Sequence, residues 1–279
     1  MQQLIKKNLP LIYGAYFNSL AYFSESLAAQ KAFNTFCKVR KGKVLPHQAS
    51  FLDQARKETE TVAGHQIQSY QWRGTGATVL LVHGWESNSF RWRNLIQFLR
   101  VNDFNIIAFD APAHGYSSGE YLHVPLYSEC VLHMLEKHRP KHLVGHSVGG
   151  MTALYTQSRY PENSVEKIVT IGAPSEFHEI MEHYRQLLNL GPRVMRALDQ
   201  LVMDRFGFRV REFSGSAFAR KIDRKGMIFH DKLDSVTPFH ASEHIHSQWQ
   251  DSILVPTEGL GHSMHQDAVN KKIVDFLMS

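Results

Sequence analysis

A serine near the middle of the chain lies in a pattern that could make it a nucleophile. Residues 145–149 read Gly-His-Ser-Val-Gly, with Ser147 at the centre. An apolar run precedes this stretch, and a helical pattern follows it as far as Pro161. A sharp strand-to-helix turn pushes a serine hydroxyl out of the sheet, and small residues must flank it because the turn is tight. The alternative is that Ser147 only caps the N-terminus of an ordinary helix.

The same pattern occurs a second time, in a different context. Residues 115–119 read Gly-Tyr-Ser-Ser-Gly, with Ser117 at the centre. The apolar run before it, residues 105–109, ends several residues earlier, and Gly119 and Pro125 follow. These residues favour a surface loop, so we interpret Ser147 and not Ser117 as the candidate nucleophile.

A serine nucleophile needs a base and an acid that orients the base. His262 lies in a short loop that reads Gly-Leu-Gly-His, where a histidine can be placed freely. Two acids, Asp231 and Asp234, follow the apolar run at 227–230. We favour Asp234 because it lies deeper in the loop and just ahead of a helix start, whereas Asp231 can fix the turn. The resulting order along the chain is Ser147, Asp234, His262, which is typical of one class of serine hydrolase.

The developing oxyanion needs hydrogen-bond donors, and one loop is suited to supply them. The apolar run at 77–82 is followed by His83, Gly84 and Trp85. Gly84 lets the backbone come close, so the N–H of Trp85 could point at a substrate oxygen together with the N–H of Val148. The alternative is a turn in which the glycine only permits a positive φ. Gly84, His83 and His146 are our candidates for residues lining the substrate pocket.

Short apolar runs alternate with helical patterns along most of the chain. This alternation predicts an α/β fold with a mostly parallel, doubly wound sheet, whose ligands bind at the carboxyl ends of the strands. The expected strands are residues 66–72, 77–82, 105–109, 143–145, 167–172, 226–230 and 252–255. The expected helices are residues 50–57, 90–101, 126–138, 151–160 and 268–278.

One long stretch interrupts the alternation. Residues 175–224 contain helical patterns at 178–190 and 192–206 but no strand, and they are too many for a simple connection. We interpret them as a helical lid, although ordinary packing helices would give the same pattern. The expected organisation is an N-terminal helical arm (1–60), a core (61–174 and 225–279) and a lid insertion (175–224).

Positive charge is concentrated in the N-terminal arm. The chain has a net charge of +5, and residues 1–45 carry seven lysines and arginines against one acid, Glu25. This distribution argues against a nucleic-acid groove in the main body. Residues 9–23 are apolar and aromatic but are interrupted by polar residues, which is unlike a signal peptide or a membrane span. The arm therefore contains either helices packed against the domain or an amphipathic anchor on a membrane surface.

The sequence points to no metal site and no cofactor. Cys37 and Cys130 lie in unrelated contexts, so we expect free thiols in a reducing, cytoplasmic compartment. His178, Glu179 and His183 resemble a zinc-protease motif, but the second histidine comes one residue too late. Nothing in the sequence indicates an oligomeric state.

Together these motifs resemble the α/β-hydrolase superfamily, and most closely its lidded serine esterase and lipase-like members. The resemblance runs from about Gln66 to the C-terminus and includes the motifs at residues 83–85, 109–117, 145–150, 234–238 and 259–262. It implies ester hydrolysis through an acyl-enzyme, with Ser147 as nucleophile, His262 as base and then acid, and Asp234 orienting it. It also implies oxyanion donors at the backbone of Trp85 and Val148.

The resemblance leaves the substrate open. His-Gly-Trp at residues 83–85 replaces the His-Gly-Gly-Gly of one lipase and esterase branch, which disfavours esters of bulky tertiary alcohols. We expect a small-molecule ester with a small to medium acyl chain, or a thioester. Other chemistry of the family (acyltransferase, perhydrolase or lyase) and a non-catalytic ligand-binding member are the alternatives.

Overall fold

The computed structural model describes residues 2–279, with side chains from residue 8 onward, and the chain divides into two compact units. The sheet unit comprises Val39–Ser175 and Gly215–Ser279. The helical unit comprises the residues up to Lys38 together with Glu176–Ser214.

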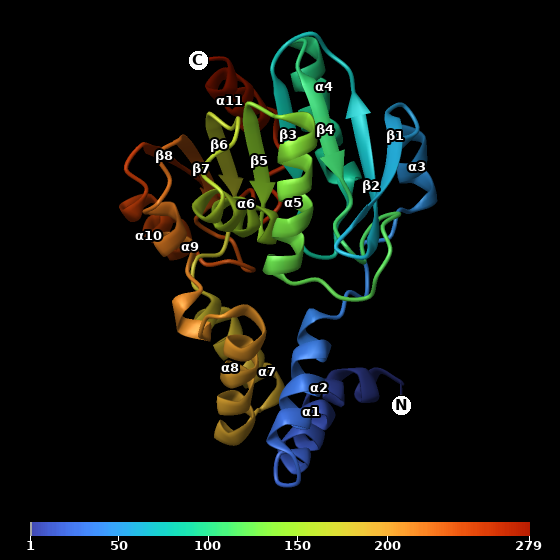
Figure 1. Cartoon of the computed structure of the whole chain (residues 1–279), viewed down its shortest axis with the longest axis vertical. Coiled ribbons are helices and arrows are strands. Elements are labelled where there is room, and N and C mark those ends of the chain that lie inside the picture. Colours follow the sequence, from blue (N-terminus) through green and yellow to red (C-terminus); the bar gives the residue numbers. More distant parts are fainter. Residues whose placement is uncertain (1) are drawn as a thin grey trace. The chain divides into compact units, whose positions relative to one another are not determined.

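The sheet unit is built on eight strands in the order β1-β2-β4-β3-β5-β6-β7-β8 (Figure 1). β2 runs antiparallel to β1 and β4, and every other neighbouring pair is parallel. This confirms the predicted mostly parallel sheet. The strands are β1 (Arg56–Val62), β2 (His65–Trp72), β3 (Thr78–Val82), β4 (Asn105–Phe109), β5 (His142–His146), β6 (Lys167–Ile171), β7 (Lys225–Asp231) and β8 (Ser252–Thr257).

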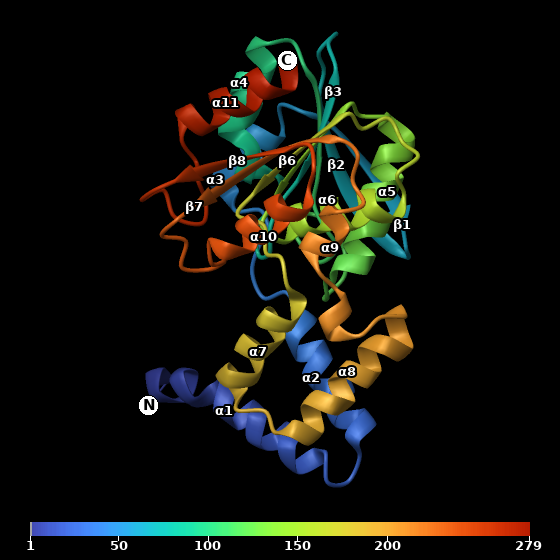
Figure 2. The same cartoon turned by 90° about the vertical axis from the view of Figure 1, so that its left-hand side faces the viewer.

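Helices cover both faces of this sheet, which is why its central strands are almost entirely apolar (Figure 2). One face carries α3 (Pro46–Leu52), α4 (Arg93–Val101) and α11 (Asp267–Met278), which share one apolar core with the sheet. The other face carries α5 (Val124–His138) and α6 (Val148–Arg159). The short helices are η1 (Ser89–Trp92), α9 (Gly215–Ala219) and α10 (His240–Gln248).

The register of the parallel strands brings several loops to one edge of the sheet. Val82 pairs with Gly145, and His146 pairs with Ile171 in the next strand along. Ile171 in turn pairs with Phe229. The residues that follow β3, β5, β6 and β7 therefore meet at the carboxyl edge, where open α/β sheets bind their ligands.

Two details of the sequence interpretation were wrong. The helix expected at residues 50–57 is α3, at Pro46–Leu52, and the chain then forms β1 from Arg56 onward. β1 is an edge strand whose side chains are mostly exposed, so it lacks the apolar alternation that marks a strand. Ser117 lies in a loop as predicted, but it is buried, and its hydroxyl donates to the carbonyl of Asp110 at 2.6 Å.

The helical unit brings together segments from distant parts of the sequence. It contains α1 (Gln2–Leu20), α2 (Glu25–Cys37), α7 (Phe177–Leu188), α8 (Pro192–Phe206) and η2 (Val210–Glu212). Helices α7 and α8 confirm the helical patterns predicted at 178–190 and 192–206. Phe17, Phe33, Met181 and Leu198 lie in its apolar core. The N-terminal helices therefore pack with the inserted ones, which the sequence alone did not indicate.

Hydrogen bonds also tie the two segments of the helical unit to each other. The hydroxyl of Tyr184 on α7 donates to the carbonyl of Ala32 on α2 at 2.9 Å. The side chain of Asn18 donates to the carbonyl of Asn189 and accepts from the N–H of Gly191.

Cys37 and Cys130 are buried free thiols. Within residues 2–279, no helix is both long enough and apolar enough to cross a bilayer.

Candidate active site

Ser147 occupies a strained turn between β5 and α6. Its backbone has φ 53° and ψ −125°, a conformation that residues with a side chain rarely adopt. The N–H of Ser147 donates to the carbonyl of Ile171 at 2.8 Å, which ties the turn to the end of β6. A Cβ atom on Gly149 would lie 2.2 Å from the carbonyl oxygen of Val82, so no larger residue fits there. This is the geometry that exposes a nucleophile above a sheet.

His262 and Asp234 form a hydrogen-bonded pair. Nδ1 of His262 lies 2.7 Å from Oδ2 of Asp234, whose side chain is completely buried. The other carboxylate oxygen, Oδ1, accepts the N–H groups of Val236 at 2.8 Å and Thr237 at 3.0 Å. The carboxylate is therefore fixed in place and keeps the proton of His262 on Nδ1. This tautomer leaves the lone pair of Nε2 available to act as a base.

The competing acid, Asp231, has a different task. Its carboxylate accepts hydrogen bonds from the N–H groups of Leu233 and Leu260 and from the hydroxyl of Thr257. Burial alone would raise the pKa of Asp231, but these hydrogen bonds outweigh it and hold the pKa below its ordinary value. Asp231 thus fastens its own turn to the loop that carries His262.

The proposed nucleophile and base flank the end of β6. The ring of His146, the residue before Ser147, lies 4.8 Å from the ring of His262, measured between centroids. Nε2 of His146 donates to the backbone carbonyl of His262 at 3.0 Å. A Cβ atom on Gly172 would lie 3.3 Å from Nδ1 of His262, just beyond Ile171, which binds the amide of Ser147. The structure therefore brings Ser147, Asp234 and His262 together at one edge of the sheet.

The loop after β3 runs close to Ser147. A Cβ atom on Gly84 would lie 3.1 Å from Cβ of Ser147 and 2.7 Å from Nδ1 of His146. Only a glycine lets this backbone approach so closely, and Trp85 follows it directly. Val148 is the first residue of α6, so its N–H has no partner within the helix and lies at the positive end of the helix dipole. Both amides are thus close to the proposed nucleophile.

Two buried histidines hold this loop in position. Nδ1 of His83 donates to the carbonyl of Gly84 at 2.7 Å, and its Nε2 accepts the N–H of Ala111 at 3.0 Å. Nδ1 of His114 donates to a carbonyl, and its Nε2 accepts the N–H of Glu86 at 2.9 Å. Burial lowers the pKa of His83 to about 4 and that of His114 to about 3, so both rings are neutral near pH 7.

These contacts suggest supporting roles for two of the predicted pocket residues. His83 and His146 are both buried, and both bind backbone groups of the loops around Ser147. His114 plays the same part, yet we assigned it no role from the sequence, although it lies within the 109–117 motif. Its loop position gave no sign that its ring reaches back to the amide of Glu86.

Arg91 is a further residue that sequence reasoning missed. Its side chain is only 9% exposed, and burial, with Arg93 nearby, lowers its pKa to about 9. One guanidinium nitrogen donates to the carbonyl of Ser263 at 2.9 Å, and another lies 3.4 Å from Nε2 of His265. Arg91 thus binds the loop immediately after His262. Nothing in the local pattern of η1 distinguishes it from a solvated arginine.

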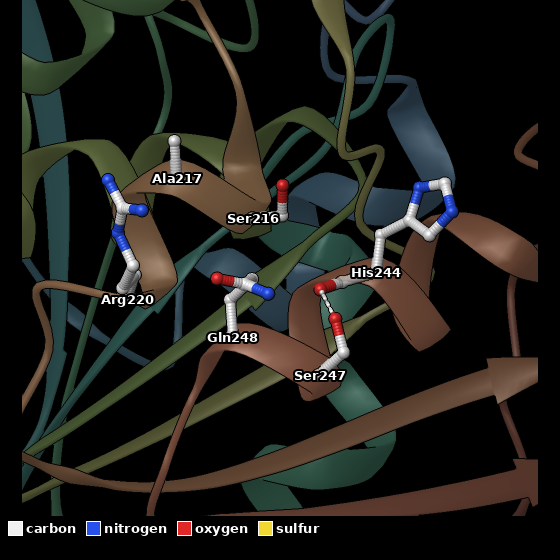
Figure 3. Close-up of a pocket in the computed structure, with 6 residues that line it drawn as sticks. All are labelled: Ser216, Ala217, Arg220, His244, Ser247 and Gln248. Atoms are coloured by element: carbon white, nitrogen blue, oxygen red, sulfur yellow. Dashed lines mark hydrogen bonds between the residues drawn. The ribbon is translucent and has the colours of Figure 1, made fainter.

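A separate polar hollow lies between α9 and α10, with a volume of about 300 Å³. Figure 3 shows Ser216 and Ala217 on one side and the α10 residues on the other, where the hydroxyl of Ser247 donates to the carbonyl of His244. The lining residues are Ser216, Ala217, Arg220, His244, Ser247 and Gln248. It contains none of Ser147, Asp234 and His262, so it is distinct from the site described above.

Comparison with known proteins relates the chain to one fold. A family model described as "alpha/beta hydrolase fold" matches residues 77–204. A serine hydrolase-like protein of Danio rerio is 33% identical over 41% of this chain. A pimeloyl-[acyl-carrier protein] methyl ester esterase of Vibrio vulnificus is 28% identical over 52%. These matches span 37% and 54% of the two relatives, less than two thirds of either.

The solved structures agree on the fold. An esterase from Exiguobacterium antarcticum superposes with a TM-score of 0.63 at 18% sequence identity. The alignment covers 80% of this chain and all of the esterase. The likeness therefore extends well beyond the segment that the family model matches.

Proposed function

We propose that the chain is a serine hydrolase of the α/β-hydrolase superfamily and that it cleaves carboxylic esters. One observation carries the proposal: a serine occupies a strained strand-to-helix turn, and the residue before it, His146, contacts a histidine whose Nδ1 is hydrogen-bonded to a buried carboxylate. That arrangement matches what nucleophilic attack on an acyl carbon requires. The esterase name of the Vibrio vulnificus relative supports ester hydrolysis in particular.

In the first half of the proposed reaction, the hydroxyl of Ser147 attacks the ester carbonyl. Nε2 of His262 takes the hydroxyl proton, and Asp234 stabilises the imidazolium that forms. The N–H groups of Trp85 and Val148 bind the oxyanion of the tetrahedral intermediate. The intermediate collapses when His262 returns the proton to the departing alcohol, leaving the acyl group on Ser147.

In the second half, water replaces the alcohol. Nε2 of His262 removes a proton from the water as it attacks the acyl-enzyme, and the same two amides bind the new oxyanion. Collapse releases the carboxylic acid and returns the proton to Ser147. Asp234 keeps the ring oriented throughout, while His83, His114 and His146 hold the surrounding loops.

The proposed substrate is a small-molecule ester with a small to medium acyl chain. Thioesters remain the second class to compare, because they react through the same acyl-enzyme. The assignment of residues 175–224 as a lid stays a prediction from the sequence.

The test is turnover of aryl esters graded by acyl chain length, measured beside the matching acyl-thioesters. We expect kcat/KM to be highest for an ester of short or medium chain, and Ser147→Ala and His262→Ala to lower it by several orders of magnitude. Ser117→Ala is the matched control, because Ser117 lies in the same sequence pattern but is buried against Asp110. Equal turnover by the folded Ser147→Ala protein would overturn the proposal.

A further inference from the structure

Helix α1 carries a stripe of exposed apolar side chains that lies outside the buried core of the helical unit. Its inner side, at Gly14 and Phe17, is buried, and so is Ala21 directly after the helix. A second set of large apolar side chains recurs at helical spacing and is exposed; its members are Leu9, Ile12, Tyr13 and Tyr16. Residues three and four apart lie on the same side of a helix, so these side chains form one continuous stripe.

The stripe continues onto the turn that joins α1 to α2, at one end of the helical unit (Figure 1). Tyr22 and Phe23 in this turn are 76% and 89% exposed, and Leu27 on α2 is exposed beside them. Single apolar residues are common on the surfaces of soluble proteins, but a contiguous group of this size usually marks a binding surface. We call Leu9, Ile12, Tyr13, Tyr16, Tyr22, Phe23 and Leu27 the apolar edge.

Positive charge accompanies the apolar edge. Lys6 and Lys7 precede it in the sequence, and residues 1–38 contain four lysines against one acid, Glu25. The guanidinium of Arg193 lies 4.8 Å from the centre of the Tyr22 ring and also pairs with Glu25. Aliphatic and aromatic side chains flanked by cations are the composition of helices that lie in the interface of an anionic membrane.

We propose that the apolar edge docks the protein on an anionic lipid surface, with Tyr22 and Phe23 inserted among the headgroups. Charge favours lipid over a second copy of the chain. A two-fold dimer would bring a second set of the same cations to the contact. Anionic headgroups would instead neutralise them, while the protruding turn reaches the apolar boundary beneath.

The experiment is flotation of the full-length protein with lipid vesicles, which requires no enzymatic turnover. We expect wild-type protein to float with phosphatidylcholine vesicles that contain phosphatidylserine. Binding should weaken with pure phosphatidylcholine and at high salt, because salt screens the attraction of exposed charges. The double variant Tyr22→Ser/Phe23→Ser should lower the vesicle partition coefficient at least about tenfold, since it removes two large apolar anchors.

The matched control is Val101→Ser, which removes a side chain that is 86% exposed but lies in the sheet unit. It should bind vesicles as the wild type does. Absence of flotation by the wild type, or equal loss in the control variant, would overturn the proposal. The proposal would also be overturned if light scattering showed a dimer that the double variant Tyr22→Ser/Phe23→Ser dissociates. Failure of this binding test would leave ester turnover unaffected, so the two proposals can fail independently.

Discussion

His262 Nδ1 lies 2.7 Å from Oδ2 of Asp234, while Asp231, three residues earlier, bonds to the amides and hydroxyl of neighbouring turns. Two acids of one loop thus have separate tasks, one toward the imidazole and one toward the backbone. The position of each acid in the loop sets this division, because Asp231 is the last residue of β7 whereas Asp234 lies three residues further along, in the turn. It leads to opposite expectations for the two carboxylates.

Replacement of Asp234 by asparagine should damage catalysis far more than folding. The amide of Asp234→Asn is close in size to the carboxylate, but it cannot hold the proton on Nδ1 of His262 and stabilise the imidazolium. We expect kcat for ester hydrolysis to fall by about 10³–10⁴-fold, while the urea midpoint changes little.

Asp231→Asn should show the reverse pattern. The amide loses acceptor capacity toward Leu233, Thr257 and Leu260, so the free energy of unfolding should fall by a few kcal/mol. The kcat of the protein that remains folded should stay within about tenfold of wild type. If Asp231→Asn instead lost as much kcat as Asp234→Asn, the assignment of the orienting acid would be wrong.

Arg91 should act on catalysis through the loop that carries His262. Arg91→Met removes the hydrogen bond to the carbonyl of Ser263, so we expect kcat/KM to fall by about 10- to 100-fold through misplacement of the base. The pKa of His265 is lowered to about 4 by burial and then by Arg91. Removal of the positive charge should therefore raise that pKa, which NMR titration of the ring can follow.

Arg91→Lys separates the charge from the hydrogen-bond geometry. Lysine keeps the positive charge but presents a compact ammonium in place of a planar fork. The pKa of His265 should stay low in this variant, while kcat/KM recovers only in part. Wild-type kcat/KM in folded Arg91→Met would show that the loop holds His262 without this residue.

Stability should decline steeply in mild acid because two buried histidines must stay neutral. The pKa of His83 is about 4 and that of His114 about 3 in the folded chain, both below the ordinary 6.5. Between pH 6.5 and 4 the unfolded chain therefore binds more protons, and unfolding becomes more favourable as the pH falls. Each ring should cost roughly 3 kcal/mol by pH 4.

Urea titrations at a series of pH values measure this loss. His114→Gln should flatten the dependence of the unfolding free energy on pH below 6.5, even if the variant is less stable at pH 7. An unfolding free energy that is constant from pH 7 to pH 4.5 would contradict the neutral, buried state of both rings.

Gly14 should be essential to the packing of α1 on α7. Alanine is the better helix former, so propensity alone predicts that Gly14→Ala stabilises α1 by about 1 kcal/mol. Packing predicts the opposite, because the added Cβ atom would lie 1.6 Å from the carbonyl oxygen of Leu188. We expect hydrogen exchange to speed up in both α1 and α7. The exposed neighbour is the control: Ala15→Gly should affect α1 alone.

The parallel sheet and its helices could be predicted from the sequence because each buried strand is an apolar run. The strands at Asn105–Phe109 and Lys167–Ile171 and the helix at Pro192–Phe206 lie within a residue or two of the predicted bounds. β1 could not be predicted, because most of its side chains are exposed and its pattern has no apolar side. Edge strands bury few side chains, so their sequences show little of the apolar pattern by which buried strands are predicted.

The positions of the proposed triad could also be inferred, since each follows an apolar run in a loop with few residues to choose from. The supporting contacts could not. Arg91 reaches Ser263 across 172 positions of the chain, and His114 reaches Glu86 across 28. Such long-range hydrogen bonds leave no local pattern. The association of α1 and α2 with α7 and α8 could not be predicted either, because it also joins segments that are far apart in the sequence.

The central claim is that Ser147 is an activated nucleophile. Intact mass spectrometry after incubation with a fluorophosphonate tests it most directly, with the adduct located by peptide mapping. We predict one adduct per chain, on Ser147, which is lost in Ser147→Ala and slowed in His262→Ala and Asp234→Asn. A folded wild-type protein that gains no adduct, or gains it on Ser117 or another residue, would contradict the account.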